Sequence, residues 1–374
     1  WDRAGNLARA IESLEKAIAL DPKHAPSYAQ LAIAYCQRNV TAPDSQWLRS
    51  ARDAALQALK LNPDLALSHV AMARVHIAEK STRDAEAELQ RALVLDPRMA
   101  DAHRWLGFVY SSGKDAPAAE KSFRAALALD PADWRNSHEL AAFLYKQARY
   151  SEAITVLRDA TARISGNNVL HRTLAAALHM NGNYDEAASE FQRALEIEPS
   201  PAVYNNLGTL RFFQGRYADA VPAFEKAVER NAGSYLYWGN LGDAYRWAPG
   251  MRAKAATAYT RAIQLVRVQL KDRPDYPELR SRLALYLAKV GDAPAARAEL
   301  AQLATAANRS AAEYFREAIT WELTGSRDKA LASLQSAVRG GYSDLEIQNE
   351  PELVSLRADR RYHLMMAAKE TNAK

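Results

Sequence analysis

Three histidines come closest, in type and spacing, to residues that could bind a metal ion. They are His69, His103 and His171, and the second interval between them is twice the first. Equivalent residues of successive helical repeats lie about one helix pair apart, which is too far for nitrogens that must approach a zinc ion to about 2 Å. The sequence has no His-Glu-x-x-His pattern and no cysteine beside these histidines. We therefore expect them to pack within the fold and to bind no metal.

The sequence also lacks the motifs that are typical of nucleophilic catalysis. A hydrolase elbow of the Gly-x-Ser-x-Gly type is absent, as are the Gly-rich loop and the His-Arg-Asp segment of a protein kinase. Cys36 is the only cysteine, so no internal disulfide can form. Its position would let it face a groove, but we favour a small buried thiol. The sequence predicts that the chain is not an enzyme, with no catalytic residues and no cofactor.

The composition favours a folded helical chain with a surface of mixed charge. Hydrophobic residues make up 48% of the 374 residues, whereas Gly and Pro number only 15 each. The 49 basic and 44 acidic residues are interleaved, and the formal net charge is +5. No apolar run approaches the roughly 20 residues that span a bilayer. We expect a solvated surface, with neither nucleic acid nor a membrane as a partner of this chain.

The elements that must position these residues recur with a regular period. Segments end at Pro97, Pro131 and Pro199, and here too the second interval is twice the first. Each proline follows the frame Ala-x3-Leu/Phe-x2-Ala-x4-Pro. Alanine fills the first slot in all ten copies of the frame: Ala10, Ala51, Ala85, Ala119, Ala153, Ala187, Ala220, Ala255, Ala296 and Ala330. A constant alanine on an amphipathic helix indicates that two helix backbones approach closely there.

A second periodic segment precedes each of these helices, as in Trp238-x2-Leu241-Gly242-x2-Tyr245. A Trp/Leu/Gly/Tyr helix followed by an Ala/Phe/Ala/Pro helix, at a period of about 34 residues, resembles the tetratricopeptide repeat (TPR). The resemblance covers about residues 5–340. It implies an all-α fold, an α-α superhelix or TPR solenoid, with about nine helix pairs after a leading half repeat. Residues 1–20 supply only the second helix of a repeat, so we expect a longer protein to continue upstream.

The array departs from its period in a way that predicts its domain organisation. After Ala255 the helical pattern continues to residue 271, which predicts one overlong helix. The repeats beyond it match the frame less well. We expect a main array over residues 1–271, weaker repeats over 272–340, and a capping segment over 341–374 with Leu353, Leu356, Tyr362 and Met365 covering the last repeat.

The tail and one repeat carry a second resemblance. Residues 340–362 and 238–245 resemble the C-terminal TPR arrays of large bacterial signalling proteins, in which the array follows a serine/threonine kinase, an adenylate cyclase or a winged-helix regulator. This resemblance implies an interaction or sensing region. We expect a cytoplasmic location, or alternatively a periplasmic or other extracytoplasmic part of a membrane-bound signalling protein.

The family resemblance also indicates which residues would contact a partner. In TPR arrays the first helix of each pair lines the concave face, and its outward residues are the second, fifth, sixth, ninth and twelfth of the repeat. Asn206 and Asn240 are sixth residues of successive repeats, and amides at these places can pair with the backbone of an extended peptide. Phe212 and Arg246 are twelfth residues, which we expect to be exposed. The candidate peptide-binding residues are Asn205, Asn206, Phe212, Asn240, Asp243 and Arg246.

These features favour a scaffold that binds a protein or an extended peptide. Two alternatives remain open from the sequence. A helical-repeat nucleic-acid binder would show steeply salt-dependent binding. A structural module that only associates with itself would change its scattering with concentration.

Overall fold

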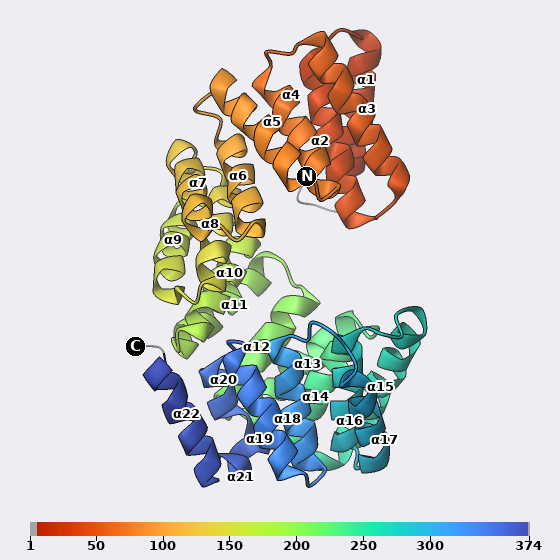
Figure 1. Ribbon diagram of the computed structural model, residues 1–374, viewed down its shortest axis with the longest axis vertical. Coiled ribbons are helices and arrows are strands. Elements are labelled where there is room, and N and C mark those ends of the chain that lie inside the picture. The colour runs from red at the N-terminus through yellow and green to blue at the C-terminus, as the bar shows by residue number, and fades with distance from the viewer. Residues whose placement is uncertain (1–5, 373–374) are drawn as a thin grey trace. The chain divides into compact units, whose positions relative to one another are not determined.

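The computed structural model describes residues 6–372, and Figure 1 shows its arrangement. The described residues form 22 α-helices and one short 3-10 helix, with no strand among them. The predicted fold class is therefore confirmed: an all-α, α-α superhelix of the TPR type. The lone helix α1 (Asn6–Leu20) is followed by nine helix pairs, α2 to α19, and by a C-terminal capping segment. The chain divides into two compact units, residues 1–173 and 174–374.

The first unit contains the leading half repeat, four complete helix pairs and the start of α10. Its elements are α1, α2 (Ala25–Thr41), α3 (Ser45–Leu61), α4 (Ala66–Ala78), α5 (Thr82–Leu95), α6 (Ala100–Ser112), α7 (Ala116–Leu129), α8 (Trp134–Lys146), α9 (Tyr150–Arg163) and the first residues of α10 (Asn168–Met180).

The second unit contains the remaining repeats and the cap. Its elements are the rest of α10, α11 (Tyr184–Ile197), α12 (Pro201–Phe213), α13 (Tyr217–Arg230), α14 (Tyr235–Trp247), α15 (Arg252–Asp272), α16 (Pro277–Lys289), α17 (Ala293–Leu303), α18 (Ala311–Leu323), α19 (Arg327–Arg339), α20 (Asp344–Asn349), η1 (Pro351–Leu353), α21 (Val354–Arg357) and α22 (Arg360–Asn372).

The alanine of each repeat lies where the helices pack. Nine of the ten alanines in the first slot of the frame are buried, eight of them at 0% exposure, and only Ala10 is partly exposed. A glycine on the facing helix allows the same close approach. A Cβ at Gly208 would lie 2.7 Å from the ring of Phe224, and one at Gly242 would lie 2.6 Å from the ring of Tyr259. The close helix packing that the sequence predicts is therefore present.

The even-numbered helices lie on the inner side of each stack. They contact one another from repeat to repeat, as α2 does with α4, α4 with α6, α12 with α14, and α16 with α18. In a curved stack of helix pairs, the helices on the inner side approach each other most closely. The first helix of each pair therefore lines the inner side of its stack.

The predicted overlong helix is confirmed as α15, which has 21 residues. The domain boundary predicted at residue 272 lies within the second unit, and α15 packs against α16 across it through Val266, Leu279 and Leu283. The division of the array at this point stays a prediction that proteolysis can test. None of the described helices is long and apolar enough to cross a membrane.

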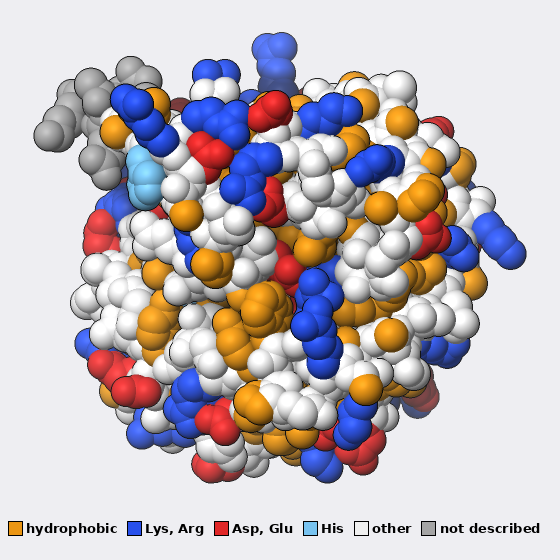
Figure 2. All heavy atoms as spheres, turned by 90° about the horizontal axis from the view of Figure 1, so that it is seen from below, with side chains coloured by type: hydrophobic (Ala, Val, Ile, Leu, Met, Phe, Trp, Pro, Cys, Tyr) orange, Lys and Arg blue, Asp and Glu red, His pale blue; other side chains and the backbone are white. Residues whose placement is uncertain are grey.

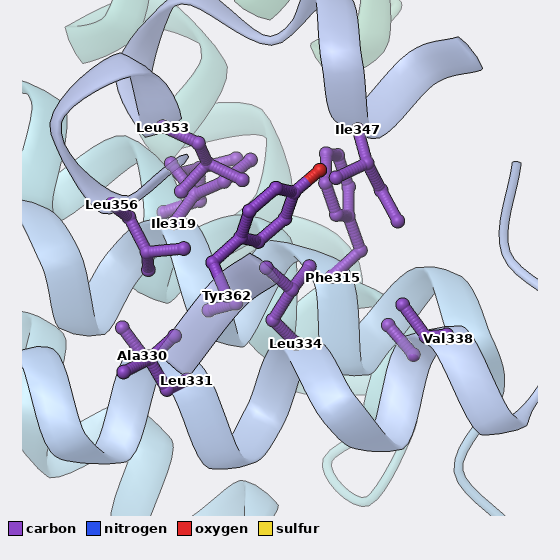
Figure 3. Packing of buried hydrophobic residues seen from close by; sticks show 13 residues of the cluster. Phe315, Ile319, Ala330, Leu331, Leu334, Val338, Ile347, Leu353, Leu356 and Tyr362 are labelled. Carbon is purple, nitrogen blue, oxygen red and sulfur yellow. The ribbon is translucent and has the colours of Figure 1, made fainter. Parts of the chain in front are cut away.

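The residues after α19 cap the last repeat, as the sequence predicts. The chain turns at Gly341, which has a positive φ of 81°. Beyond it, Leu353 and Leu356 are completely buried and Tyr362 is 6% exposed. Figure 3 shows these side chains beside Ile319, Phe315, Leu334 and their neighbours on α18 and α19. Met365 is partly buried against the same cluster.

Candidate functional site

The three regularly spaced histidines have a structural role. Their Nε2 atoms lie 2.8 to 3.1 Å from the backbone carbonyl oxygen six residues earlier, that of Pro63 for His69, Pro97 for His103 and Ser165 for His171. The indole N–H of Trp238 donates in the same way to the carbonyl of Ala232, at 2.9 Å. The histidines thus occupy the place of the repeat's usual aromatic residue. Within the described residues, no group of three or more His, Cys, Asp and Glu is arranged to hold a metal ion.

The single thiol is buried, as we expect from the sequence. Cys36 is 3% exposed and packs among the alanines of α2 and α3. Burial raises the pKa of its thiol to about 11. A thiol with so high a pKa is a poor nucleophile at neutral pH, because the reactive species is the thiolate.

The candidate asparagines lie on neighbouring inner helices and are partly bonded to each other. The Nδ2 of Asn240 donates to Oδ1 of Asn205 at 2.8 Å, which ties α14 to α12. Asn205 is only 7% exposed. Asn206 is partly exposed, and none of the described residues hydrogen-bonds to its side-chain amide. Asn206 is therefore the amide most available to a partner, and Asn205 is a structural residue that supports Asn240.

Phe212 does not have the exposed position that we expect from its place in the repeat. It is 9% exposed and packs with Val221, Phe224 and Leu241. Its ring also lies 5.0 Å from that of Tyr217. The expectation of exposure is wrong because Tyr217 and Phe224 of α13, together with Leu241 of α14, cover this twelfth position.

Asp243 and Arg246 are both engaged by other parts of the second unit. Asp243 accepts a hydrogen bond from Tyr259 at 2.6 Å and pairs with the ammonium of Lys289 on α16. Arg246 pairs with Glu352 of η1, Nε to Oε1, at 2.6 Å. The chain's own C-terminal segment therefore occupies the side of α14 that carries these two residues.

The charges around Lys289 form one buried cluster. Burial acts to lower the pKa of Lys289, but the neighbouring carboxylates of Asp243, Glu350 and Glu352 raise it above its usual value. Burial also raises the pKa of Glu350, to about 7, although Lys289 opposes the shift. A lysine among three carboxyl groups holds η1 against α14 and α16.

Two arginines that the sequence analysis did not select continue the row of sixth residues. Arg282 on α16 and Arg316 on α18 hold the same repeat position as Asn206 and Asn240, and both are partly exposed. We call the surface formed by Asn206, Asn240, Arg282 and Arg316 the polar row of the second unit. The repeat frame could have found both arginines, had it been continued through the weakly matching repeats after residue 271.

The charge pattern of the molecular surface agrees with the interleaved sequence. Figure 2 shows one end of the second unit, where Lys and Arg side chains alternate with Asp and Glu around more hydrophobic central parts. A separate groove of about 530 Å³ lies between α11, α12 and α13 and includes Tyr204, Arg211 and Arg216. It is open and shallow, and it is distinct from the polar row.

Comparison with known families identifies the chain. Sequence models described as tetratricopeptide repeat match residues 2–24, 70–134, 167–232 and 205–277, which together make up more than half of the chain. The chain belongs to the tetratricopeptide repeat family. Arrays of this family are scaffolds that bind proteins or peptides, and the fold is typically non-catalytic. A comparison with curated proteins found no match.

Solved structures are similar to this chain at low sequence identity. One chain of the APC/C hetero-tetramer Cut9–Hcn1 aligns with this protein over 75% of this chain and 53% of its own length, at 14% identity and a TM-score of 0.54. A tetratricopeptide repeat protein from Parabacteroides merdae aligns with 70% of this chain and 99% of its own, at 18% identity and a TM-score of 0.49. YrrB, described as a TPR protein with an unusual peptide-binding site, aligns with 49% of this chain and 95% of its own, at 22% identity and a TM-score of 0.41.

Proposed function

We propose that the chain binds an extended peptide segment of a partner protein, and that the polar row of the second unit is the binding site. The observation that carries the proposal is that four successive inner helices present a polar side chain at the same repeat position: Asn206, Asn240, Arg282 and Arg316. A partner lying across these helices would meet one such group from each repeat.

Hydrogen bonding to the peptide backbone explains how such a row would work. An amide side chain both donates and accepts, so it can satisfy the N–H and C=O groups of a bound chain whatever its sequence. Asn206 has its whole amide available, whereas Asn240 uses its Nδ2 on Asn205 and keeps its Oδ1. Each bond contributes about 0.5–1.5 kcal/mol net. Affinity would therefore come from several repeats together.

A peptide array with a matched pair of variants tests this proposal. We expect Asn206→Ala to bind the peptides that the parent chain captures on the array roughly 2- to 12-fold more weakly, the equivalent of about 0.5–1.5 kcal/mol. Gln269→Ala, an exposed amide on the outer helix α15, should bind as the parent does. Asn240→Ala is a poorer test, because it would leave the buried Asn205 without its partner. Equal loss in both variants, or in neither, would count against the polar row.

We also propose that this array is the interaction or sensing region of a larger bacterial signalling protein. The support is the resemblance of residues 238–245 and 340–362 to arrays that follow a kinase, cyclase or winged-helix domain. In that arrangement the polar row would hold a peptide from a regulator or a substrate. The full reading frame tests the proposal, since one that encodes no signalling domain contradicts it.

A further inference from the structure

We propose that Arg282 and Arg316 form a subsite for an acidic side chain, so that the peptide held by the polar row carries an Asp or Glu carboxylate at this place. The inference rests on the proposed function, because it names the chemistry of the partner at the same surface. It goes further in assigning the two arginines a ligand.

The two guanidinium groups are held close together by the helices that carry them. Nε of Arg316 donates to the hydroxyl of Ser281 at 2.9 Å, and Ser281 is the immediate neighbour of Arg282 on α16. The guanidinium of Arg282 lies 5.7 Å from the ring centre of Tyr235 on α14. Three inner helices therefore fix the positions of both groups before any ligand arrives.

The charge of this subsite is not balanced within the described residues. Arg282 has a carboxylate partner in Glu278, Nε to Oε1, at 3.2 Å. Arg316 has no such partner among the residues that the structure describes, and its hydrogen-bonding partner is the neutral Ser281. Burial and the nearby charge of Arg282 lower the pKa of Arg316 to about 10, so it remains a cation at neutral pH. The charge of Glu278 also acts on Arg316, but the ion pair of Glu278 is with Arg282, so one carboxylate serves two arginines. A partly buried cation with no ion pair of its own is stabilised by a carboxylate that pairs with it.

The same unit already holds an acidic segment of its own beside this row. Glu352 is held by Arg246 on α14, and the Glu352 side chain is only 5% exposed. The segment Glu350-Pro351-Glu352 supplies carboxyl groups to the cluster around Lys289 but none to Arg316. The inner helices α14 and α16 thus bind carboxylates through Arg246 and Arg282, whereas a carboxylate that pairs with Arg316 would have to come from outside the described residues.

The test compares two synthetic fluorescent peptides, one alternating alanine with glutamate and the other alternating alanine with glutamine. Fluorescence anisotropy should show that the parent chain binds the glutamate peptide about tenfold more tightly, and that added salt reduces the difference. Arg316→Gln should abolish the preference, whereas Arg316→Lys should keep part of it. The control is Arg267→Gln, which removes an exposed arginine from α15 and should keep the full preference.

The possible failures separate the two proposals. If the parent binds both peptides equally and Asn206→Ala weakens both, the acidic subsite is wrong and the peptide-binding row stands. If neither peptide binds at all, the proposed row fails and the subsite fails with it. If Arg316→Gln folds, as judged by circular dichroism, and still prefers the glutamate peptide, the carboxylate binds elsewhere. The preference of the parent chain for the glutamate peptide is measured without any variant. A folding defect in a variant therefore cannot account for a negative result.

Discussion

Replacing Lys289 by methionine should destabilise the second unit through the loss of one buried charge. The Lys289 side chain is 4% exposed and pairs with Asp243, while Glu350 and Glu352 lie close enough to raise its pKa. Methionine has nearly the same shape and volume, so the change leaves little cavity. The variant therefore removes the charge of the cluster with little effect on its packing.

The expected loss in the free energy of unfolding depends on how far the carboxylate partner of Lys289 is exposed to solvent. Removing one member of a buried ion pair costs about 3–5 kcal/mol, because the other charge is left uncompensated. Asp243 is 22% exposed and keeps its hydrogen bond from Tyr259, which places the loss at the lower end, about 3 kcal/mol. Adding Asp243→Asn should recover part of this loss, with a coupling energy of about 1–3 kcal/mol.

Urea unfolding followed by circular dichroism measures both quantities. Lys271→Met, at an exposed position of α15, is the matched control and should lie within about 0.5 kcal/mol of the parent. If Lys289→Met unfolds at the same urea concentration as the parent, the ion cluster does not hold the C-terminal segment in place. If the double variant shows no coupling, Lys289 and Asp243 do not form the pair.

Four further predictions concern other parts of the chain. Ala187 is completely buried, so Ala187→Leu should lower the free energy of unfolding by about 1–3 kcal/mol in urea melts. Ser189→Leu, at an exposed position of the same helix, should be nearly neutral. Equal stability of the two variants would contradict the close packing at Ala187. The folded chain raises the pKa of Glu350 to about 7. Between about pH 4.5 and 7, Glu350 is therefore protonated in the folded chain and loses this proton when the chain unfolds. The free energy of unfolding should therefore fall as pH rises through this window, and less steeply in Glu350→Gln; the same slope in both would contradict the raised pKa. Limited proteolysis should cut within residues 272–277 before it cuts inside the helices, and cuts confined to the termini would argue against a division there. Cys36, with a pKa raised to about 11, should react with iodoacetamide only after unfolding in urea, and rapid labelling of the folded chain would show that the thiol is accessible.

Most of the fold could be predicted because the repeat constrains it locally. The alanine of each frame is read directly from the period of the sequence, and it is buried because two helices meet there. The histidines could be assigned to packing for the same reason, since they fall where Trp238 falls in its repeat. Periodicity fixes such residues before any long-range contact is known.

The candidate site was harder to predict because its contacts join distant parts of the chain. Arg246 lies opposite Glu352, 106 residues later, and Asp243 meets Lys289, 46 residues later. No local sequence pattern predicts that the C-terminal segment folds back onto α14. The burial of Phe212 likewise depends on Tyr217 and on the next helix pair. Position within a repeat predicts which face a side chain is on, but not what else covers that face.

Hydrogen–deuterium exchange with a bound peptide tests the central claim most directly. The account predicts that the glutamate peptide slows amide exchange in α12, α14, α16 and α18, the helices of the polar row, and leaves the outer helices α13, α15 and α17 unchanged. Protection of α11, α12 and α13, which line the open groove beside Tyr204, without protection of α14, α16 and α18 would contradict it and would place the peptide in that groove.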